Sequence, residues 1–326
     1  MGTGERALDD TGSASGAPVP RSRRPLRRGR RLLSCVLGAG GLAMGLLVAS
    51  PGLASADTTH VCSGTDGSPG VLTGTYSKST EVVVHGWCVV DAGQATVEGT
   101  VTLQPNSVLL AAFARNDVTG EGTSGLSVVG NVFVQSGATL LLGCEASHFA
   151  CIDDPNAESP TLSSADSIGG NLVETNPLGV VVHLTTIGGG VTETGGGGGV
   201  SCTPSGPFAK FGSPVYSDYE DTTIGQALSI SNLSSCWLGV ARVHVHGNAT
   251  IKNDQLADPD AIEILDNHVG ENLACYDNSM VWDSADLTND LYPRQPEPNT
   301  VGGQRLGQCV LASPPTKGGV SGPGPF

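Results

Sequence analysis

The segment Ile168-Gly-Gly-Asn-Leu-Val-Glu-Thr175 recurs nineteen residues later as Ile187-Gly-Gly-Gly-Val-Thr-Glu-Thr194. Related phrases, with an apolar residue before a glycine and a short alternating segment after it, occur at 128–134, 245–251 and 269–274. A period near twenty residues, built from short strands and glycine corners, is typical of a β-solenoid. One coil cannot bury its own apolar face. Coils stacked about 4.8 Å apart pair every strand with the next coil and enclose a dry interior.

The repeat therefore predicts an all-β fold, a right-handed parallel β-helix. Glycine and asparagine suit its corners because both tolerate positive φ, and the low aromatic content of 4 % suits a narrow interior. The alternative is a pair of β-sandwiches, whose strands also alternate and turn at glycine. Sandwiches seldom repeat an Ile-Gly-Gly phrase at this spacing, so the sequence favours the β-helix.

A longer duplication overlies the short period. Residues 88–103 align without gaps with residues 236–251, and in both stretches a cysteine precedes a glycine by eleven positions. The run Gly195–Gly199 lies between the two copies and has no side chains to pack, which predicts a flexible linker. The sequence thus predicts a first half over residues 57–194 and a second half over residues 200–312. A disordered tail is expected over residues 313–326.

Residues 1–56 have the organisation of a cleaved export signal. They hold eight arginines against three acids, and an uncharged apolar stretch over residues 32–50 follows the basic run. The sequence Pro51-Gly-Leu-Ala-Ser-Ala56 predicts cleavage after Ala56, which leaves no transmembrane segment. Residues 22–27 resemble a twin-arginine motif, and the general secretory route remains an alternative. We expect a secreted or cell-surface protein.

Signal cleavage removes Cys35 and leaves eight cysteines, an even number that indicates disulfides in an exported chain. Many connectivities are open, and the two-half organisation favours pairing between neighbours in sequence. The expected pairs are Cys62–Cys88, Cys144–Cys151, Cys202–Cys236 and Cys275–Cys309. A zinc site is the competing interpretation, but no Cys-x-x-Cys spacing supports it.

The chain after residue 56 is strongly acidic. Its 270 residues hold 8 bases and 28 acids, a net charge of −20. Such a surface repels phosphate backbones, so nucleic-acid binding is excluded. It also repels polyanionic substrates, which disfavours polysaccharide lyase chemistry unless calcium intervenes.

Acidic residues gather at 153–154, 218–221, 258–260 and 283–290, mostly in proline- or asparagine-rich insertions. We interpret them as solvated loops. The alternative is calcium bound by carboxylate oxygens, with Asp283, Asp286 and Asp290 as candidate ligands. No spaced Asp-x-Asp-x-Asp-Gly pattern supports calcium, so no cofactor is expected. The sequence also lacks a Gly-x-Ser-x-Gly nucleophile elbow.

His244 and His246 point to the same side of one predicted strand and could clamp a metal. The aligned residues of the first half are Thr96 and Glu98. We therefore expect both histidines on the outer, solvent-facing side, with Val245 pointing inward.

The ending Val269-Gly-Glu-Asn-Leu-Ala-Cys275 … Pro298-Asn-Thr-Val301-Gly-Gly-Gln-Arg-Leu-Gly307-Gln-Cys309 resembles a cassette of secreted proteins from actinobacteria, the high-GC Gram-positive bacteria. Those proteins have no established activity. More broadly, the chain resembles right-handed parallel β-helix proteins. This resemblance implies either a polysaccharide-active enzyme or an inert surface scaffold, and the fold alone does not choose between them.

We therefore predict an exported, non-enzymatic extracellular or cell-envelope protein. Its function is that of a scaffold, or of a surface that binds cell-wall glycan or another envelope protein. The alternative is a β-helix polysaccharide lyase or hydrolase with its aspartates on one face. A structural component of a spore or wall coat is a third possibility.

Overall fold

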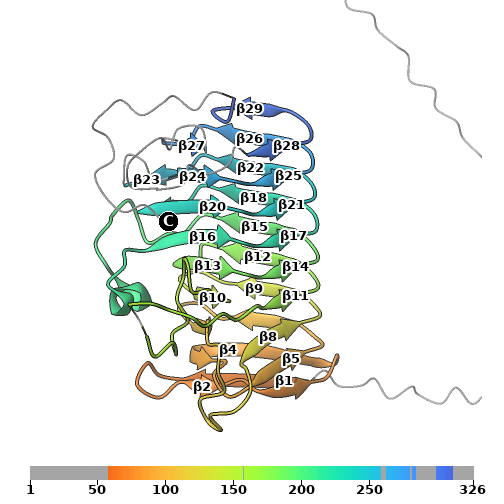
Figure 1. The fold of residues 1–326 in the computed structure, drawn as a ribbon, viewed down its shortest axis with the longest axis vertical. Helices are drawn as coiled ribbons and strands as arrows, with labels where there is room; N and C mark the ends of the chain where they lie inside the picture. The colour runs from red at the N-terminus through yellow and green to blue at the C-terminus, as the bar shows by residue number, and fades with distance from the viewer. Residues whose placement is uncertain (1–57, 157, 258–261, 280, 284–298, 311–326) are drawn as a thin grey trace, which may run out of the picture. The chain divides into compact units, whose positions relative to one another are not determined.

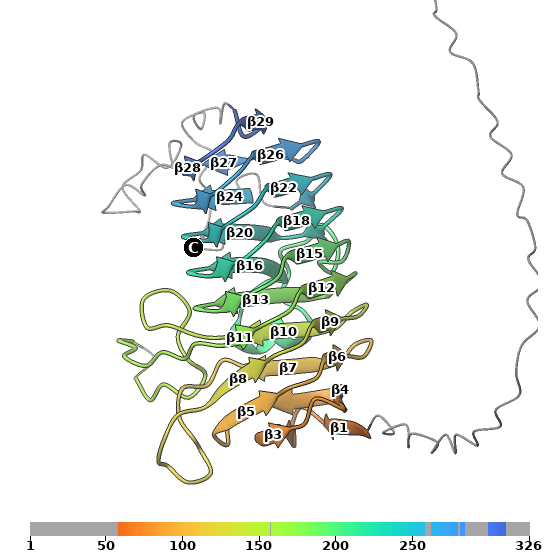
Figure 2. The same ribbon diagram turned by 90° about the vertical axis from the view of Figure 1, so that its right-hand side faces the viewer.

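The computed structural model describes residues 58–310 apart from 157, 258–261, 280 and 284–298, and this part of the chain winds into a parallel β-helix (Figures 1 and 2). Strands of successive coils pair in parallel throughout the ladder. The predicted fold is confirmed. The β-sandwich alternative is wrong, because facing sheets of antiparallel strands are absent from the described residues.

Each complete coil contributes one strand to each of three faces, numbered here in chain order. Face 1 consists of short strands: β3 (Gly74–Tyr76), β5 (Gln94–Val97), β8 (Gly125–Val128), β11 (Ser167–Ile168), β14 (Thr186–Ile187), β17 (Thr223–Ile224), β21 (His244–Val245), β25 (His268–Val269) and β28 (Thr300–Val301). Face 2 contains β6 (Val101–Leu103), β9 (Val132–Val134), β12 (Leu172–Thr175), β15 (Val191–Thr194), β18 (Leu228–Ser231), β22 (Ala249–Lys252), β26 (Leu273–Tyr276) and β29 (Arg305–Gly307).

Face 3 contains β2 (Gly70–Val71), β7 (Val108–Ala111), β10 (Thr139–Leu142), β13 (Gly179–His183), β16 (Tyr216–Glu220), β20 (Trp237–Ala241), β24 (Ile262–Leu265) and β27 (Trp282–Asp283). The long strand β4 (Thr80–Val89) belongs to faces 2 and 3, and β1 (Thr58–Gly64) pairs with it at the N-terminal end. A short pair, β19 (Ser234–Ser235) with β23 (Gln255–Leu256), lies between faces 2 and 3 in the chain order.

The nineteen-residue repeat corresponds to one coil. Ile168 pairs with Ile187 on face 1, and Leu172 pairs with Val191 on face 2. Each of these four side chains is at most 1 % exposed and belongs to one continuous apolar core. Burial of an aliphatic side chain of this size stabilises the fold by roughly 1.5–3 kcal/mol, so each added coil contributes several such increments.

Four polar side chains form a hydrogen-bonded group within the apolar interior. Glu174 and Glu193 occupy the same register of β12 and β15 and point inward, where both are at most 1 % exposed. The Tyr219 hydroxyl donates to Glu174 Oε2 at 2.6 Å and lies 3.0 Å from Glu193 Oε2. Ser217 Oγ donates to Glu193 Oε1 at 2.6 Å. Burial raises the pKa of Glu193 to about 7. Burial, followed by the charge of Glu193, raises that of Glu174 well above its ordinary value.

Asparagine and aspartate form many of the corners, as predicted for residues that tolerate the left-handed conformation. After face 2, Asn176, Asn232 and Asn253 have φ values of 49°, 59° and 58°. A second asparagine column joins coils through side chains: Asn248 Oδ1 accepts from the backbone and side-chain nitrogens of Asn272 at 3.1 and 2.9 Å. These bonds satisfy corner groups that the strand ladder leaves unpaired.

All four predicted disulfides are present: Cys62–Cys88, Cys144–Cys151, Cys202–Cys236 and Cys275–Cys309. Because all eight cysteines are bonded in pairs, the zinc interpretation is wrong. Two of the disulfides anchor segments that leave the coils, and these segments matter for the candidate site below.

The predicted flexible linker is wrong for Gly195–Gly199. The run is hydrogen-bonded to the coils on both sides: Gly195 N donates to the Ser231 carbonyl at 2.8 Å, and Gly197 N donates to the Pro177 carbonyl at 2.9 Å. All five glycines have positive φ, and a Cβ added at Gly196 would lie 2.1 Å from the Pro177 carbonyl oxygen. Glycine is therefore required by tight packing between coils. The aligned residues Val97 and Val245 lie in one inward column of face 1, which every coil from β5 to β28 repeats. The predicted tail, residues 313–326, lies outside the described residues.

Candidate functional site

Two excursions from the coils cover the outer surface of face 3. The first follows β10 and includes the Cys144–Cys151 loop, and the second lies between β15 and β16 and includes the 3-10 helix η1 (Gly206–Phe211). Their apolar residues pack on outward side chains of the sheet in a cluster separate from the interior, with Phe208 against Tyr216 at 5.3 Å between ring centroids. The excursions shield part of the outer surface of face 3 from water. Without this cover, the surface would be exposed to solvent.

A histidine lies between two carboxylates on this covered strip. Alternation along β16 points Tyr219 inward and Asp218 and Glu220 outward. His183, at the end of β13, is the register partner of Glu220. Its Nε2 is 3.1 Å from Asp218 Oδ2, and its Nδ1 is 3.1 Å from Glu220 Oε2. All three residues are 1 % exposed.

The surrounding carboxylates favour the charged form of this histidine. Burial lowers the pKa of His183, but hydrogen bonds with Asp218 and Glu145 outweigh burial and raise it above its ordinary value. A buried charge is tolerated where it is paired on both sides. The imidazolium therefore offsets the negative charges of Asp218 and Glu220.

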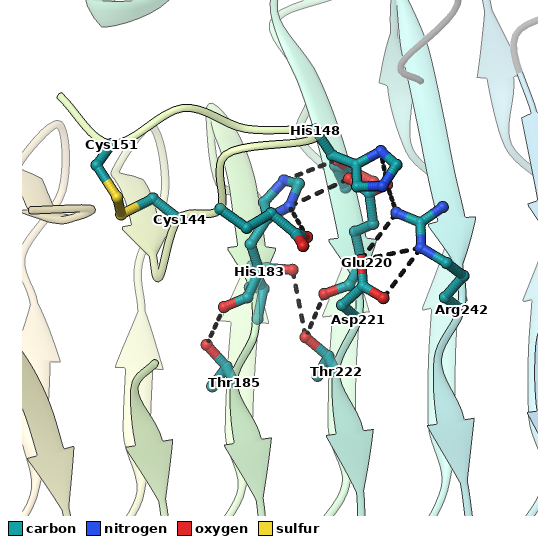
Figure 3. A network of polar contacts seen from close by, with 12 residues as sticks. Cys144, His148, Cys151, His183, Thr185, Glu220, Asp221, Thr222 and Arg242 are labelled. Carbon is teal, nitrogen blue, oxygen red and sulfur yellow. Dashed lines mark hydrogen bonds and ion pairs between the residues drawn. A yellow bond between two sulfur atoms is a disulfide. The ribbon is translucent and has the colours of Figure 1, made fainter. Parts of the chain in front are cut away.

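Asp221 and Arg242 occupy equivalent corners of successive coils, directly after β16 and β20. Both have left-handed backbones, with φ values of 48° and 52°, a conformation that costs roughly 1–2 kcal/mol for a residue with a Cβ. The corners bring the side chains together: Arg242 Nε is 3.0 and 2.9 Å from the two Asp221 carboxylate oxygens, and its Nη2 also donates to Glu220 (Figure 3). The Thr222 hydroxyl donates to the Glu220 carbonyl at 2.8 Å. Arg242 thus holds two adjacent carboxylates.

The Cys144–Cys151 loop completes the cluster from above the sheet (Figure 3). Glu145 Oε1 is 3.5 Å from His183 Nδ1, and His148 Nδ1 is 3.4 Å from Glu220 Oε1. The Phe149 ring stacks on the His183 imidazole at 4.9 Å with an interplanar angle of 18°. The loop therefore both shields the cluster and contributes charge to it.

The carboxyl groups of Glu145 and Asp221 interact, and their pKa values move in opposite directions. Burial and the hydrogen bond to Glu145 raise the pKa of Asp221 to about 7. Burial alone raises the pKa of Glu145, but hydrogen bonds with His183 and Asp221 outweigh it and lower the value to about 2. The Arg242 guanidinium favours an ionised Asp221, so the two carboxyl groups titrate as a coupled pair. With His183 and Arg242 positive, and Asp218, Glu220 and this pair each negative, the cluster carries about one net negative charge.

A cavity of about 140 Å³ lies beside the cluster, and it is lined by Ser147, His148, Phe149, His183, Tyr216, Asp218 and Glu220. Asp218 lines this cavity, and its Oδ1 is buried and accepts no hydrogen bond from the described residues. A buried acceptor without a donor costs about 1–3 kcal/mol. The cavity is therefore suited to a group that donates a hydrogen bond or carries positive charge, between the rings of Phe149 and Tyr216.

Two sets of side chains in the cluster have the spacing of metal ligands: Glu145 with His148 and Asp221, and Glu145 with His183 and Glu220. Metal ligands must be deprotonated. His183 is held as an imidazolium, and Arg242 occupies both Asp221 and Glu220. The arrangement fits a proton or an organic donor better than a metal ion.

The structure places the residues predicted from sequence in several settings. Asp153 accepts hydrogen bonds from the backbone nitrogens of Ala114 and Arg115, so it supports a loop. The interpretation of 218–221 as a solvated loop is wrong, because Asp218 and Glu220 lie on a covered strand. Of the calcium candidates, Asp283 has a described backbone in β27, whereas Asp286, Asp290 and the Asp283 side chain lie outside the described residues.

Sequence reasoning missed Glu145, His148, His183 and Arg242 as members of a cluster. Their separations along the chain carry no motif, and they meet because one excursion folds over face 3. The available signal was Asp218-Tyr219-Glu220, in which two acids alternate around an aromatic residue as in a half-buried strand.

No helix among the described residues is long and apolar enough to cross a membrane. Comparisons with protein-family models, with curated proteins and with solved structures found no match for this chain.

Proposed function

We propose that this protein is an exported β-helix scaffold that binds a glycan in the cavity on face 3, without turning it over. The observation that carries the proposal is Asp218, a buried carboxylate that lines the cavity and whose Oδ1 receives no hydrogen bond from the described residues. A sugar hydroxyl or ammonium group supplies the missing donor, and the four disulfides are compatible with an oxidising compartment.

The surroundings of Asp218 favour a sugar over an unspecified cation. Phe149 and Tyr216 line the same cavity, and Tyr216 packs against Trp237 at 5.8 Å between ring centroids. Aromatic faces pack on the apolar face of a sugar ring, while carboxylates accept from its hydroxyl groups. The net negative charge of the cluster disfavours uronic acids, so the expected ligand is a neutral sugar or an amino sugar.

Binding without turnover is favoured by the position of the two coupled carboxyl groups. Glu145 and Asp221 do not line the cavity, whereas the carboxylates that do, Asp218 and Glu220, are paired with His183. No carboxylic acid of the described cluster is therefore poised to protonate a glycosidic oxygen.

A hydrolase is the second candidate, and one observation favours it. Burial and neighbouring groups separate the pKa values of Glu145 and Asp221 to about 2 and about 7, and glycosidases use such a difference to assign base and acid roles.

The test is calorimetric titration of the secreted protein with neutral, amino-sugar and uronic-acid oligosaccharides. Wild type should bind a neutral or amino sugar, and Asp218→Asn should weaken binding at least tenfold. Glu121→Gln, a change at an exposed loop residue, is the matched control. Binding that Asp218→Asn leaves unchanged, or no binding to any of these sugars, would reject the proposal. Release of reducing ends that Glu145→Gln abolishes would replace it with the hydrolase.

A further inference from the structure

The exposed side of face 1 carries a regular column of polar side chains, one from each coil. The column is Thr75, Thr96, Ser127, Ser167, Thr186, Thr223, His244, His268 and Thr300. Hydroxyl residues fill it except at two adjacent coils, which carry histidine. His246 follows His244 by two residues on the same strand direction, so its side chain emerges on the same side.

The His244 imidazole lies close to the other two. His244 and His268 are direct register partners in β21 and β25, with ring centroids 5.2 Å apart. The rings of His244 and His246 are 4.7 Å apart. All three side chains are exposed, as predicted for His244 and His246, while Val245 between them is buried.

The coils beside His246 leave room for its ring. In the same register, the neighbouring coils have Gly225 and Gly270, which carry no side chains. The described residues make no hydrogen bond or ion pair to these three imidazoles. Their nitrogens can therefore turn toward a common point by rotation of exposed side chains, without displacing a partner.

We propose that His244, His246 and His268 form a site for a divalent transition-metal ion such as Zn²⁺. Two histidines separated by one residue on a strand, with a third on the adjacent strand, supply three nitrogen ligands from one side and leave the fourth position to water. Neutral imidazole suits zinc, copper and nickel rather than calcium.

This site is independent of the proposed glycan site, which lies on face 3. It uses residues that pack on neither the apolar core nor the covering excursions. A bound metal with an open position would let face 1 coordinate a carboxylate or imidazole of a ligand, a property that the hydroxyl column alone lacks.

The experiment is titration of tag-free protein with Zn²⁺ at pH 7.5, followed by Co²⁺ and its visible absorption spectrum. Wild type should bind one Zn²⁺ per chain and give a Co²⁺ spectrum typical of tetrahedral coordination. His246→Asn and His268→Asn should each weaken binding at least tenfold. His85→Asn, at another exposed strand histidine, should change the affinity less than twofold.

Glu145→Gln distinguishes this site from the carboxylate–histidine cluster. It should leave the zinc affinity unchanged, and thermal denaturation of every variant verifies that the fold persists. Loss of zinc binding in Glu145→Gln but not in His246→Asn would overturn the proposal, as would a wild-type protein that binds no zinc at these concentrations.

Discussion

Raising the pH from 5 to 8 should destabilise the protein, because its interior holds carboxyl groups that ionise with difficulty. Burial raises the pKa of Glu193 from 4.5 to about 7. A carboxyl whose pKa is higher in the folded state stabilises the fold fully below its unfolded pKa, and this stabilisation is lost as pH rises through the folded pKa. The shift of about 2.5 units corresponds to about 3 kcal/mol. For a domain of this size, that lowers Tm by roughly 10 °C.

Glu193→Gln isolates this contribution. The amide has nearly the shape of the protonated acid and never ionises; its oxygen can accept from Ser217, and its nitrogen can donate to the Tyr219 oxygen. The variant should match wild type near pH 5 and exceed its Tm at pH 8. Burial also raises the pKa of Asp166 and Asp254 to about 7. The Tm of the variant should therefore still fall with pH, though less than that of wild type. The difference between the two Tm–pH curves measures the contribution of Glu193.

The assay is thermal unfolding at a fixed scan rate between pH 4.5 and 8.5, with Glu121→Gln as an exposed control that should follow wild type. A wild-type Tm that stays flat or rises from pH 5.5 to 8 would refute the reasoning. A Glu193→Gln curve parallel to wild type would also refute it, since the buried pair would then contribute no proton linkage.

Three further outcomes are expected. Serine at both Cys144 and Cys151 should cost about 2–3 kcal/mol of unfolding free energy through loop entropy and weaken glycan binding, measured by urea denaturation and calorimetry. Ile187→Ala, at a position with 0 % exposure, should cost about 2–5 kcal/mol in the same urea assay. Gly225→Ala would place a Cβ 2.3 Å from a backbone oxygen of the preceding coil and should cost about 1–3 kcal/mol, whereas Gly67→Ala meets open space and should leave Tm unchanged.

The fold was predictable from the sequence where the coils carry no excursions. From Ile168 to Ile187 the chain makes one coil without excursions, so the sequence repeat and the strand register coincide. From Val128 to Ile168, and from Ile187 to Ile224, an excursion lengthens the coil and hides the period. The two stretches of the apparent duplication belong to two coils of the same continuous ladder, in which Val97 and Val245 occupy one column.

The interior glutamates were also within reach of the sequence. Glu174 and Glu193 occupy the same position of the nineteen-residue repeat, two residues after an inward Leu172 or Val191. Strand alternation places both in the core, and the pairing places them in adjacent coils. What the sequence does not contain is their partner, because Tyr219 reaches them from the opposite face.

The candidate cluster was not predictable, for a physical reason. Asp218 and Glu220 alternate as strand residues, but alternation does not reveal whether an outer face is wet or covered. Charges on an uncovered face are screened by water and interact weakly. Under the Cys144–Cys151 loop the same carboxylates lose water and require partners, which His183 and Arg242 supply.

The excursion and the charge cluster therefore depend on each other. Without its charged residues, the covered part of face 3 would only extend the apolar cluster around Phe208. Without the covering loop, the same charged residues would be exposed to water, and their pKa values would be ordinary. Their combination yields a desolvated strip in which two carboxylate oxygens, Asp218 Oδ1 and Glu145 Oε1, lack a hydrogen-bond donor among the described residues. In the register of Asp218, the next two coils of face 3 have Gly239 and then Glu263, a second buried carboxylate. Recognition on this β-helix is thus expected where an excursion lies over charged strand residues, and it should be lost when the loop is released, even if every coil stays wound.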